Sequence, residues 1–170
     1  AGTNIAVRIP FEAGEAPSGD MVSVKATIGN HRMAVAPMEG ASIIAVPDCN
    51  GTMTIHLSTQ MAHAVRDLSA MFLGLDSESL HLIVPAVGGG FGGKTPAEPD
   101  YVAIMAAARH IGRPVGWVQS RSENIATMQA RGHRFETTLH ATVDGLITSV
   151  EVDALTDVGA YPGIGCGMVI

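Results

Sequence analysis

The sequence predicts an α+β fold of mixed or antiparallel strands with two main helices. Residues 58–74 carry apolar side chains at helical spacing and residues 100–111 are rich in alanine; both stretches lie between groups of strand-like stretches. Asn50-Gly51 and Asp144-Gly145 are dipeptides typical of β-hairpin turns. Because strands follow strands and no βαβ unit repeats, this order favours an α+β arrangement over a doubly wound parallel sheet.

The first strands are expected at residues 21–28 and 31–35, which alternate apolar and polar side chains, with a bend or bulge at Gly29-Asn30. Two further strands, at 42–46 and 52–57, are joined by the first hairpin dipeptide. Together these stretches predict that the first third of the chain is built of strands.

The first helix is predicted between well-marked borders. Ser58 and Thr59 are residue types favoured at N-caps, and Gly74 is a typical C-terminal stop. Its apolar face is expected to comprise Met61, Ala64, Val65, Leu68, Met71, Phe72 and Leu75. Gln60 then lies in the first turn, where unpaired amides and the positive end of the helix dipole favour an anion. On position alone, a solvated cap residue is the simpler interpretation of Gln60.

The rest of the chain is predicted to contain a second helix, a short helical turn and four more strands. Gly112 and Pro114 end the alanine-rich helix, and Ser120 caps a helical turn expected over 121–128. The remaining strands are expected at 80–84 (a buried strand), 115–119, 135–143 and 146–155, the last two around the second hairpin dipeptide.

Composition argues against several classes of function. Of 170 residues, 46% are hydrophobic and 15% charged, and the net charge of −6 disfavours nucleic acid or an anionic membrane surface as a partner. No run approaches the roughly 20 apolar residues that a membrane span needs. Seven histidines show no zinc-ligand spacing. Cys49 and Cys166 have no partner at metal-ligand spacing, as expected of reduced thiols in a reducing, cytoplasmic compartment.

The chain is organised around a glycine-rich loop at residues 87–95, V-G-G-G-F-G-G-K-T. Clustered glycines are costly in backbone entropy, so they are expected where the backbone needs positive φ or must approach a ligand closely. Successive N–H groups in such a loop can converge into an anion-binding nest. Phe91, its one bulky side chain, is then expected to point into the core or against the ligand.

Residues 88–95 also fit the G-x-x-x-x-G-K-[ST] pattern of P-loop nucleotide triphosphatases. In a P-loop, however, the Lys and Thr open a helix whose N-terminal amides hold the phosphates. Here Pro96 and Pro99 follow, and Pro99 stands where a continuing helix needs its amide hydrogen. A P-loop-like phosphate-binding module and a non-catalytic scaffold domain therefore stay as alternatives only.

The same loop resembles the G-G-G-F-G-G-K loop of the molybdenum hydroxylases, the family of xanthine dehydrogenase, aldehyde oxidoreductase and the aerobic carbon monoxide dehydrogenase large chain. Further segments resemble motifs of that family in the same order along the chain: 30–32, 36–39, 58–66, 113–117, 121–124 and the D-x-G-A-Y stretch 157–161. Together these matches are far more specific than the loop alone.

The resemblance implies a domain that holds a molybdenum–pyranopterin cofactor, in bacteria often a dinucleotide form such as the cytosine dinucleotide. Gln60 matches the family's Gln beside the molybdenum, and Gly90, Phe91 and Gly92 match the loop that closes over the cofactor. The implied reaction is oxidative hydroxylation of an aldehyde, an N-heterocycle or carbon monoxide. Electrons then pass to iron–sulfur and FAD subunits or domains, the implied partners in an oligomeric complex.

Some features depart from the family pattern. Thr95 stands where the purine-oxidising members have a substrate-binding Glu, which argues against a purine substrate, and Met38-Glu39-Gly40 replaces Met-Glu-Pro. Glu39 is a conceivable base, but a Glu near a turn is expected to be solvated. The family's general base lies far toward the C-terminus of a much longer chain. We therefore assign no catalytic or protein-ligated metal residue here.

These departures, together with the apolar end at 163–170, lead us to expect a fragment. Residues 1–20, which contain Pro10 and Pro17, are expected to be a linker from a preceding domain. Residues 21–170 are then the first part of a molybdopterin-binding domain, inactive on its own.

Overall fold

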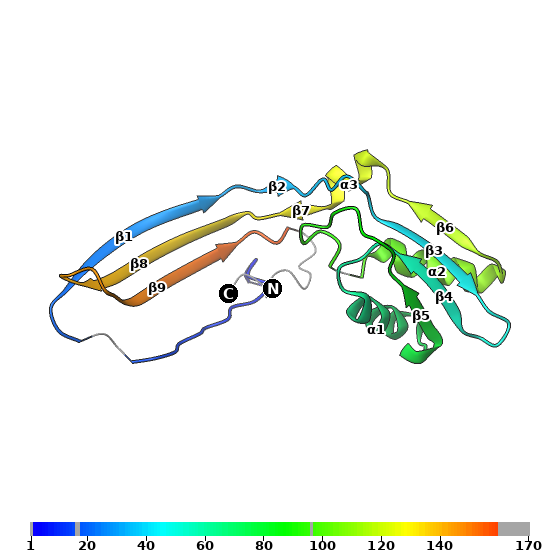
Figure 1. Cartoon of the computed structure of the whole chain (residues 1–170), viewed down its shortest axis with the longest axis horizontal. Coiled ribbons are helices and arrows are strands. Elements are labelled where there is room, and N and C mark those ends of the chain that lie inside the picture. Colours follow the sequence, from blue (N-terminus) through cyan, green and yellow to red (C-terminus); the bar gives the residue numbers. More distant parts are fainter. Residues whose placement is uncertain (1, 16–17, 96, 160–170) are drawn as a thin grey trace. The chain divides into compact units, whose positions relative to one another are not determined.

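The computed structural model describes residues 2–15, 18–95 and 97–159 (Figure 1). These residues divide into two compact units. One, which we call the helical unit, is continuous in sequence and comprises Ala34–Ala130. The other, the sheet unit, combines Ala1–Met33 with the chain from Arg131 onward. The helical unit is thus inserted in sequence between the two halves of the sheet unit.

The helical unit contains a four-stranded mixed sheet (Figure 1). Its strands are β3 (Ser42–Pro47), β4 (Met53–Leu57), β5 (Leu80–Ile83) and β6 (Val115–Val118), in the order β5-β4-β3-β6. β3 pairs antiparallel with both β4 and β6, whereas β4 and β5 are parallel. The predicted α+β class, its mixed strands and the hairpin at Asn50-Gly51 are confirmed.

Three helices accompany this sheet: α1 (Ala62–Leu73), α2 (Pro99–Ile111) and α3 (Arg121–Thr127), with a 3₁₀ turn, η1 (Ser77–Ser79). α2 packs against β3 and β6, while α1 contacts β5 and α2. Pro99 is tolerated at the start of α2 because its missing N–H would be unpaired there in any case. α3 begins with a capping box formed by Ser120 and Glu123, so the helical turn predicted at this position is confirmed.

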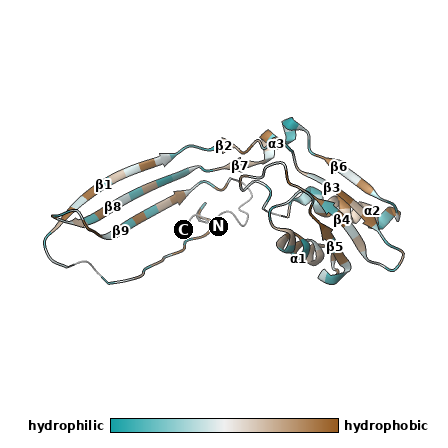
Figure 2. Ribbon diagram, viewed as in Figure 1, coloured by the Kyte–Doolittle hydropathy of each residue, from teal (hydrophilic) through white to brown (hydrophobic). Residues whose placement is uncertain are grey.

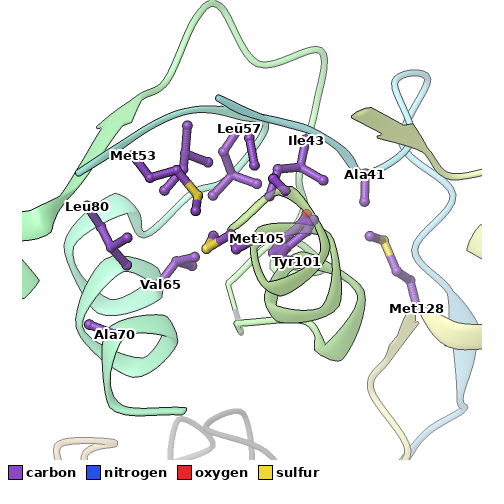
Figure 3. Close-up of a cluster of buried hydrophobic side chains, with 13 residues drawn as sticks. Ala41, Ile43, Met53, Leu57, Val65, Ala70, Leu80, Tyr101, Met105 and Met128 are labelled. Atoms are coloured by element: carbon purple, nitrogen blue, oxygen red, sulfur yellow. The ribbon is translucent and has the colours of Figure 1, made fainter. Parts of the chain in front are cut away.

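The core of the helical unit lies between this sheet and α1 and α2 (Figure 3). Alternate residues of β3 and β4 point toward the helices, because side chains along a strand alternate between its two faces. The fully or nearly buried apolar residues are Ala41, Ile43, Ala45, Met53, Ile55, Leu57, Val65, Ala70, Leu80, Tyr101, Met105, Ala108 and Met128. The strand predicted to be buried, β5, lies at the sheet edge, and only its Leu80 is buried.

The predicted start of the first helix is wrong. α1 begins at Ala62 with Met61 as its N-cap, and no side chain caps it. The hydroxyls of Ser58 and Thr59 instead donate hydrogen bonds to Glu39 and to the carbonyl of Lys94. These long-range partners hold residues 58–60 in a non-helical conformation.

The predicted apolar face of this helix is also only partly right. Val65 is buried as expected, but Met71 and Phe72 are exposed. The buried stripe instead includes Ser69 and Ala70, whose small side chains let α1 lie close to its neighbours. The prediction ranked residues by hydrophobicity alone and ignored side-chain size, so it misplaced the buried face of α1.

The sheet unit contains three long antiparallel strands in the order β1-β8-β9: β1 (Met21–Asn30), β8 (His133–Thr142) and β9 (Ile147–Thr156). The turn between β8 and β9 contains Gly145 at φ 94°, which confirms the second predicted hairpin. The register of β1 is regular through Gly29-Asn30, so no bulge occurs there, but the strand ends at Asn30. The strand expected at 31–35 is only two residues long. Two short strands, β2 (Met33–Ala34) and β7 (Gln129–Ala130), form a separate two-stranded sheet.

Hydrophobic and hydrophilic residues alternate along the three long strands (Figure 2), and their register gives the sheet one apolar and one polar face. The register aligns Val22, Val24 and Ile28 of β1 with Ala141, Leu139 and Phe135 of β8, and the apolar side chains of β9 continue the row. The opposite face carries charged and hydroxyl side chains, among them an exposed ion pair between Arg134 and Glu136. Alternation at period two, which predicted these strands, therefore also segregates their two faces.

Several sequence features lie at the surface or outside the described residues. Cys49 is exposed at the β3–β4 turn, whereas Cys166 and the apolar stretch 163–170 lie outside the described residues. Within the described ranges, none of the helices has the length and apolar character needed to cross a bilayer.

Two neighbouring residues of β3 provide a test of this packing. Ile43 is 1% exposed and points into the core, whereas Ile44 is 50% exposed on the other face of the sheet. We expect Ile43→Ala to lower the free energy of unfolding by about 2–5 kcal/mol, since it removes buried methyl groups and leaves a cavity. Ile44→Ala should cost less than about 1 kcal/mol. Urea unfolding of both variants measures the difference, and equal losses would contradict the assigned faces.

Candidate functional site

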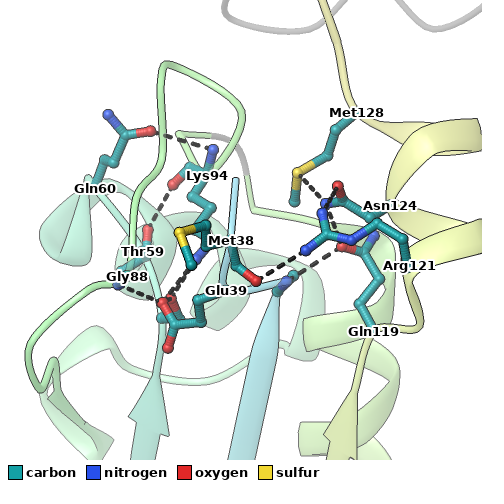
Figure 4. A network of polar contacts seen from close by, with 12 residues as sticks. Met38, Glu39, Thr59, Gln60, Gly88, Lys94, Gln119, Arg121, Asn124 and Met128 are labelled. Atoms are coloured by element: carbon teal, nitrogen blue, oxygen red, sulfur yellow. Dashed lines mark hydrogen bonds and ion pairs between the residues drawn. The ribbon is translucent and has the colours of Figure 1, made fainter. Parts of the chain in front are cut away.

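Three loops of the helical unit meet at one end of its sheet (Figure 4). The glycine loop, residues 88–95, follows β5. It contacts residues 36–39, which precede β3, and residues 58–60, which follow β4. Backbone hydrogen bonds join the three segments: Glu39 N donates to Gly88 O at 3.1 Å, and Gln60 N donates to Lys94 O at 3.0 Å. All sequence-predicted site residues lie in this cluster.

Gln60 lies before α1 and not in its first turn, so the predicted helix-dipole environment of this residue is wrong. Its side chain has a different constraint. Gln60 Oε1 accepts hydrogen bonds from Gly92 N at 3.0 Å and Lys94 N at 3.3 Å. Because the oxygen is committed to the loop, the amide NH₂ is the end of this side chain that stays available as a donor.

The glycine loop also requires the absence of a side chain at one position. A Cβ on Gly90 would overlap the carboxamide of Gln60, so these two residues fit together only when position 90 is glycine. A Cβ on Gly92 would meet nothing within 4 Å, but the backbone there has φ 83°, a left-handed conformation that favours glycine.

Phe91 is held in an unusual conformation. Its φ is 50°, which is costly for a residue with a bulky side chain, and its side chain is 75% exposed. The ring lies beside Gly89, not in the core. Of the two positions expected for this ring, the core is therefore excluded. Strain of this kind at an exposed aromatic residue is typical of binding sites.

The loop presents backbone donors. Within the described residues, the N–H groups of Gly89, Gly90 and Phe91 make no hydrogen bond. Left-handed φ values at Gly89, Phe91 and Gly92 interrupt the loop, a backbone pattern that turns successive N–H groups toward a common point. Together with the Gln60 amide, these groups can donate hydrogen bonds to an anionic or oxygen-rich ligand.

The P-loop alternative is not supported. Lys94 is fully buried, and its Nζ donates to Glu39 Oε2 at 2.8 Å and to Ser58 Oγ at 2.9 Å. Its ammonium is therefore buried and engaged by Glu39 and Ser58, and is not free to bind a nucleotide phosphate. Thr95 Oγ1 donates to Gly92 O at 2.9 Å, and α2 does not begin until Pro99.

Glu39, which was expected to be solvated, is instead a hub of hydrogen bonds. Its Oε2 accepts from Lys94 Nζ, from Ser58 Oγ at 2.8 Å and from Gly88 N at 2.7 Å. The hydrogen bond from Lys94 is the main cause of a lowered pKa of the Glu39 carboxyl; partial desolvation opposes it, and the Gly88 and Ser58 hydrogen bonds reinforce it. At neutral pH this site therefore holds a carboxylate.

A second network, which sequence reasoning missed, supports residues 36–39 (Figure 4). Arg121 donates to the carbonyl oxygen of Met38 at 2.8 Å and to Asn124 Oδ1 at 3.0 Å. Asn124 is fully buried and donates to Gln119 Oε1, which also accepts from Ala41 N. Met38 itself is 94% exposed. The match of residues 121–124 to a family motif was the one available signal for this network.

Fold and site together describe an α+β domain whose glycine loop carries backbone N–H groups without an internal hydrogen-bond partner among the described residues. No group of three or more His, Cys, Asp or Glu side chains suited to a metal ion occurs in the described part of the chain. Residues 6–169 match the model of the molybdopterin cofactor-binding domain. The chain belongs to this family.

Known relatives agree with this membership. The chain is 34% identical over 157 residues to the carbon monoxide dehydrogenase large chain of Hydrogenophaga pseudoflava, a match that covers 88% of this chain and 20% of that protein. It is 36% identical over 132 residues to the nicotine 6-hydroxylase large subunit of Paenarthrobacter nicotinovorans, covering 76% of this chain and 16% of that subunit. The chain therefore spans about a fifth of the length of these relatives or less.

Solved structures share the fold. A crystal structure of a Cu,Mo-CO dehydrogenase superimposes with a TM-score of 0.70 at 34% identity, covering 79% of this chain and 17% of that one. Identity and fold similarity thus point to the same family.

The lowered pKa of Glu39 predicts a pH dependence of stability. A carboxyl whose pKa is lower in the folded than in the unfolded chain stabilises the fold above its ordinary value, 4.5, and this stabilisation is lost as the pH falls through the folded value. Lys94→Met removes the main cause of the shift. We therefore expect wild type and Lys94→Met to differ most in unfolding free energy near neutral pH, and this difference to shrink as the pH falls below the ordinary pKa of 4.5 and through the lowered folded pKa of Glu39. Urea unfolding at several pH values measures this, and a constant difference would contradict it.

The two loop glycines provide a matched pair of variants. Gly90→Ala should displace the Gln60 carboxamide and expose the amides of Gly92 and Lys94, whereas Gly92→Ala should only add roughly 1–2 kcal/mol of backbone strain. Amide hydrogen exchange of the peptide covering residues 88–95 should therefore rise more in Gly90→Ala than in Gly92→Ala. The reverse order would show that Gln60 does not hold this loop.

Proposed function

We propose that this chain forms part of the large subunit of a molybdenum hydroxylase and contacts a molybdenum–pyranopterin cofactor through Gln60, Gly90, Phe91 and Gly92. The observation that carries the proposal is the fixed orientation of Gln60. Its oxygen is held by two loop amides, so its NH₂ is left to donate to an oxygen-bearing ligand.

The residues present fit such a group. The free N–H groups of Gly89, Gly90 and Phe91 suit an anionic group, and Gly90 leaves space only for the Gln60 side chain. Phe91, strained and exposed, supplies an apolar surface beside these donors. When bound, the cofactor would supply the redox chemistry of hydroxylation, and the chain's share would be orientation and hydrogen bonding.

The substrate class and the partners follow by analogy with relatives. One relative is named for carbon monoxide and another for nicotine, an N-heterocycle, so we propose a small substrate of these kinds or an aldehyde. Thr95 has no carboxylate to offer a purine, and its hydroxyl is engaged by Gly92. We further propose iron–sulfur and FAD partners in an oligomeric, cytoplasmic complex.

The finer assignments complete the proposal. Residues 21–170 would be the first part of a cofactor-binding domain preceded by a linker at 1–20, and the cofactor would be a dinucleotide form such as the cytosine dinucleotide. We assign the catalytic base to sequence beyond this chain, so the chain alone would be inactive. Molybdenum assay and mass spectrometry of the holoenzyme for the bound pterin test these assignments.

Gln60→Ala in the holoenzyme tests the proposed contact. A hydrogen bond to a charged group is worth roughly 1.5–3 kcal/mol, so we expect turnover to fall about tenfold or more, with less molybdenum retained after dialysis. Asp67→Ala, which changes an exposed residue of α1 outside the family-motif stretch 58–66, is the matched control and should leave both values unchanged. Unchanged turnover and molybdenum content in Gln60→Ala would reject the proposed role.

A further inference from the structure

Glu39 and Lys94 form an ion pair next to the glycine loop, with Lys94 Nζ 2.8 Å from Glu39 Oε2 (Figure 4). The Lys94 side chain is 0% exposed, whereas that of Glu39 is 36% exposed. A buried ammonium is costly unless it is paired and hydrogen-bonded, and replacing such a pair by apolar residues is often neutral for stability. A contribution to folding stability is therefore a weak explanation for the presence of this ion pair.

The pair holds both ends of the loop. At the first end, Glu39 Oε2 accepts from Gly88 N, and Glu39 N donates to Gly88 O. At the second end, the same oxygen accepts from Lys94 Nζ. One carboxylate oxygen thus joins residues that lie six positions apart in the loop.

Lys94 passes this constraint on to Gln60 through its main chain. Its carbonyl oxygen accepts from Thr59 Oγ1 at 2.9 Å and from Gln60 N at 3.0 Å, and its N–H donates to Gln60 Oε1 at 3.3 Å. The side chain of Lys94 fixes where this peptide lies, and the peptide fixes how the Gln60 carboxamide is turned. Neither Glu39 nor the Lys94 ammonium needs to touch a ligand for this.

We propose that Glu39 and Lys94 are positioning residues: their ion pair closes the glycine loop at both ends and keeps the Gln60 NH₂ directed toward the ligand. The identity of that ligand rests on the function proposed above, but the effect on the loop does not depend on it.

The unequal burial of the two partners predicts unequal effects. Glu39→Gln leaves a charged ammonium buried without a counter-charge, so Lys94 must lose its proton or move toward water and take the loop with it. Lys94→Met fills a similar volume and leaves a carboxylate that water can reach and that Gly88 and Ser58 still bond. In the double variant no buried charge is left unpaired, so it should behave like Lys94→Met.

Amide hydrogen exchange of the loop peptide in the holoenzyme and in protein stripped of cofactor is the direct test. The informative amides are those of Gly92 and Lys94, because they bond Gln60 and not Glu39. We expect their exchange to be about tenfold faster in Glu39→Gln than in wild type, as for loss of one charge-assisted hydrogen bond. We expect the double variant to return to the level of Lys94→Met. Glu136→Gln, which breaks the exposed ion pair with Arg134, is the matched control and should change nothing in this peptide.

The outcomes separate the two proposals. Two results would overturn the positioning role. One is that the Gly92 and Lys94 amides exchange as slowly in Glu39→Gln as in wild type. The other is that their exchange in the double variant stays above the level of Lys94→Met. If Glu39→Gln alone does not fold, folding of the double variant is the rescue that the pairing predicts, and failure of both overturns it. Under the proposed function, the molybdenum content per folded chain should be lower in the variants whose Gly92 and Lys94 amides exchange faster. If exchange responds as expected in the stripped protein while molybdenum content never changes, the positioning role stands and the cofactor assignment fails.

Discussion

The buried ammonium of Lys94 is the constraint on which the rest of the site depends. A charge with no access to water must find its hydrogen-bond partners within the protein, and here they are Glu39 and Ser58, from segments that flank β3 and β4. Satisfying this one group brings three chain segments together at the end of the sheet. The glycine loop is therefore anchored through Gly88 and Lys94, while the N–H groups of Gly89, Gly90 and Phe91 make no hydrogen bond within the described residues.

The groups that hold the glycine loop in place differ from the groups that are left free to donate hydrogen bonds. Gln60 uses its oxygen to bind Gly92 and Lys94 and keeps its NH₂ free, so one carboxamide serves both purposes. Gly90 is needed because the carboxamide occupies the space of a side chain. The strain at Phe91 is tolerated because both ends of the loop are fixed elsewhere.

Local chemistry predicted the elements well and the site only in part. Turn dipeptides located both hairpins, and Gly74 and Gly112 end their helices at φ 63°, as expected of C-cap glycines. The start of α1 was misplaced because the hydroxyls of Ser58 and Thr59 bond partners 19 and 35 positions away. Glu39 was misjudged for the same reason, since nothing near it in sequence reveals the buried Lys94. Family motifs supplied what local patterns could not, but without the roles of the individual atoms.

The insertion of the helical unit within the sheet unit has a consequence for the order of folding. All partners of the glycine loop lie within Ala34–Ala130, so this unit has its complete set of contacts once Ala130 has been synthesised. β1 must instead wait for β8, with Asn30 pairing to His133 across the whole inserted unit. A folded insert shortens the effective length of that connection and lowers the entropy lost on closing it. Vectorial synthesis thus favours formation of the glycine loop before the long strands pair.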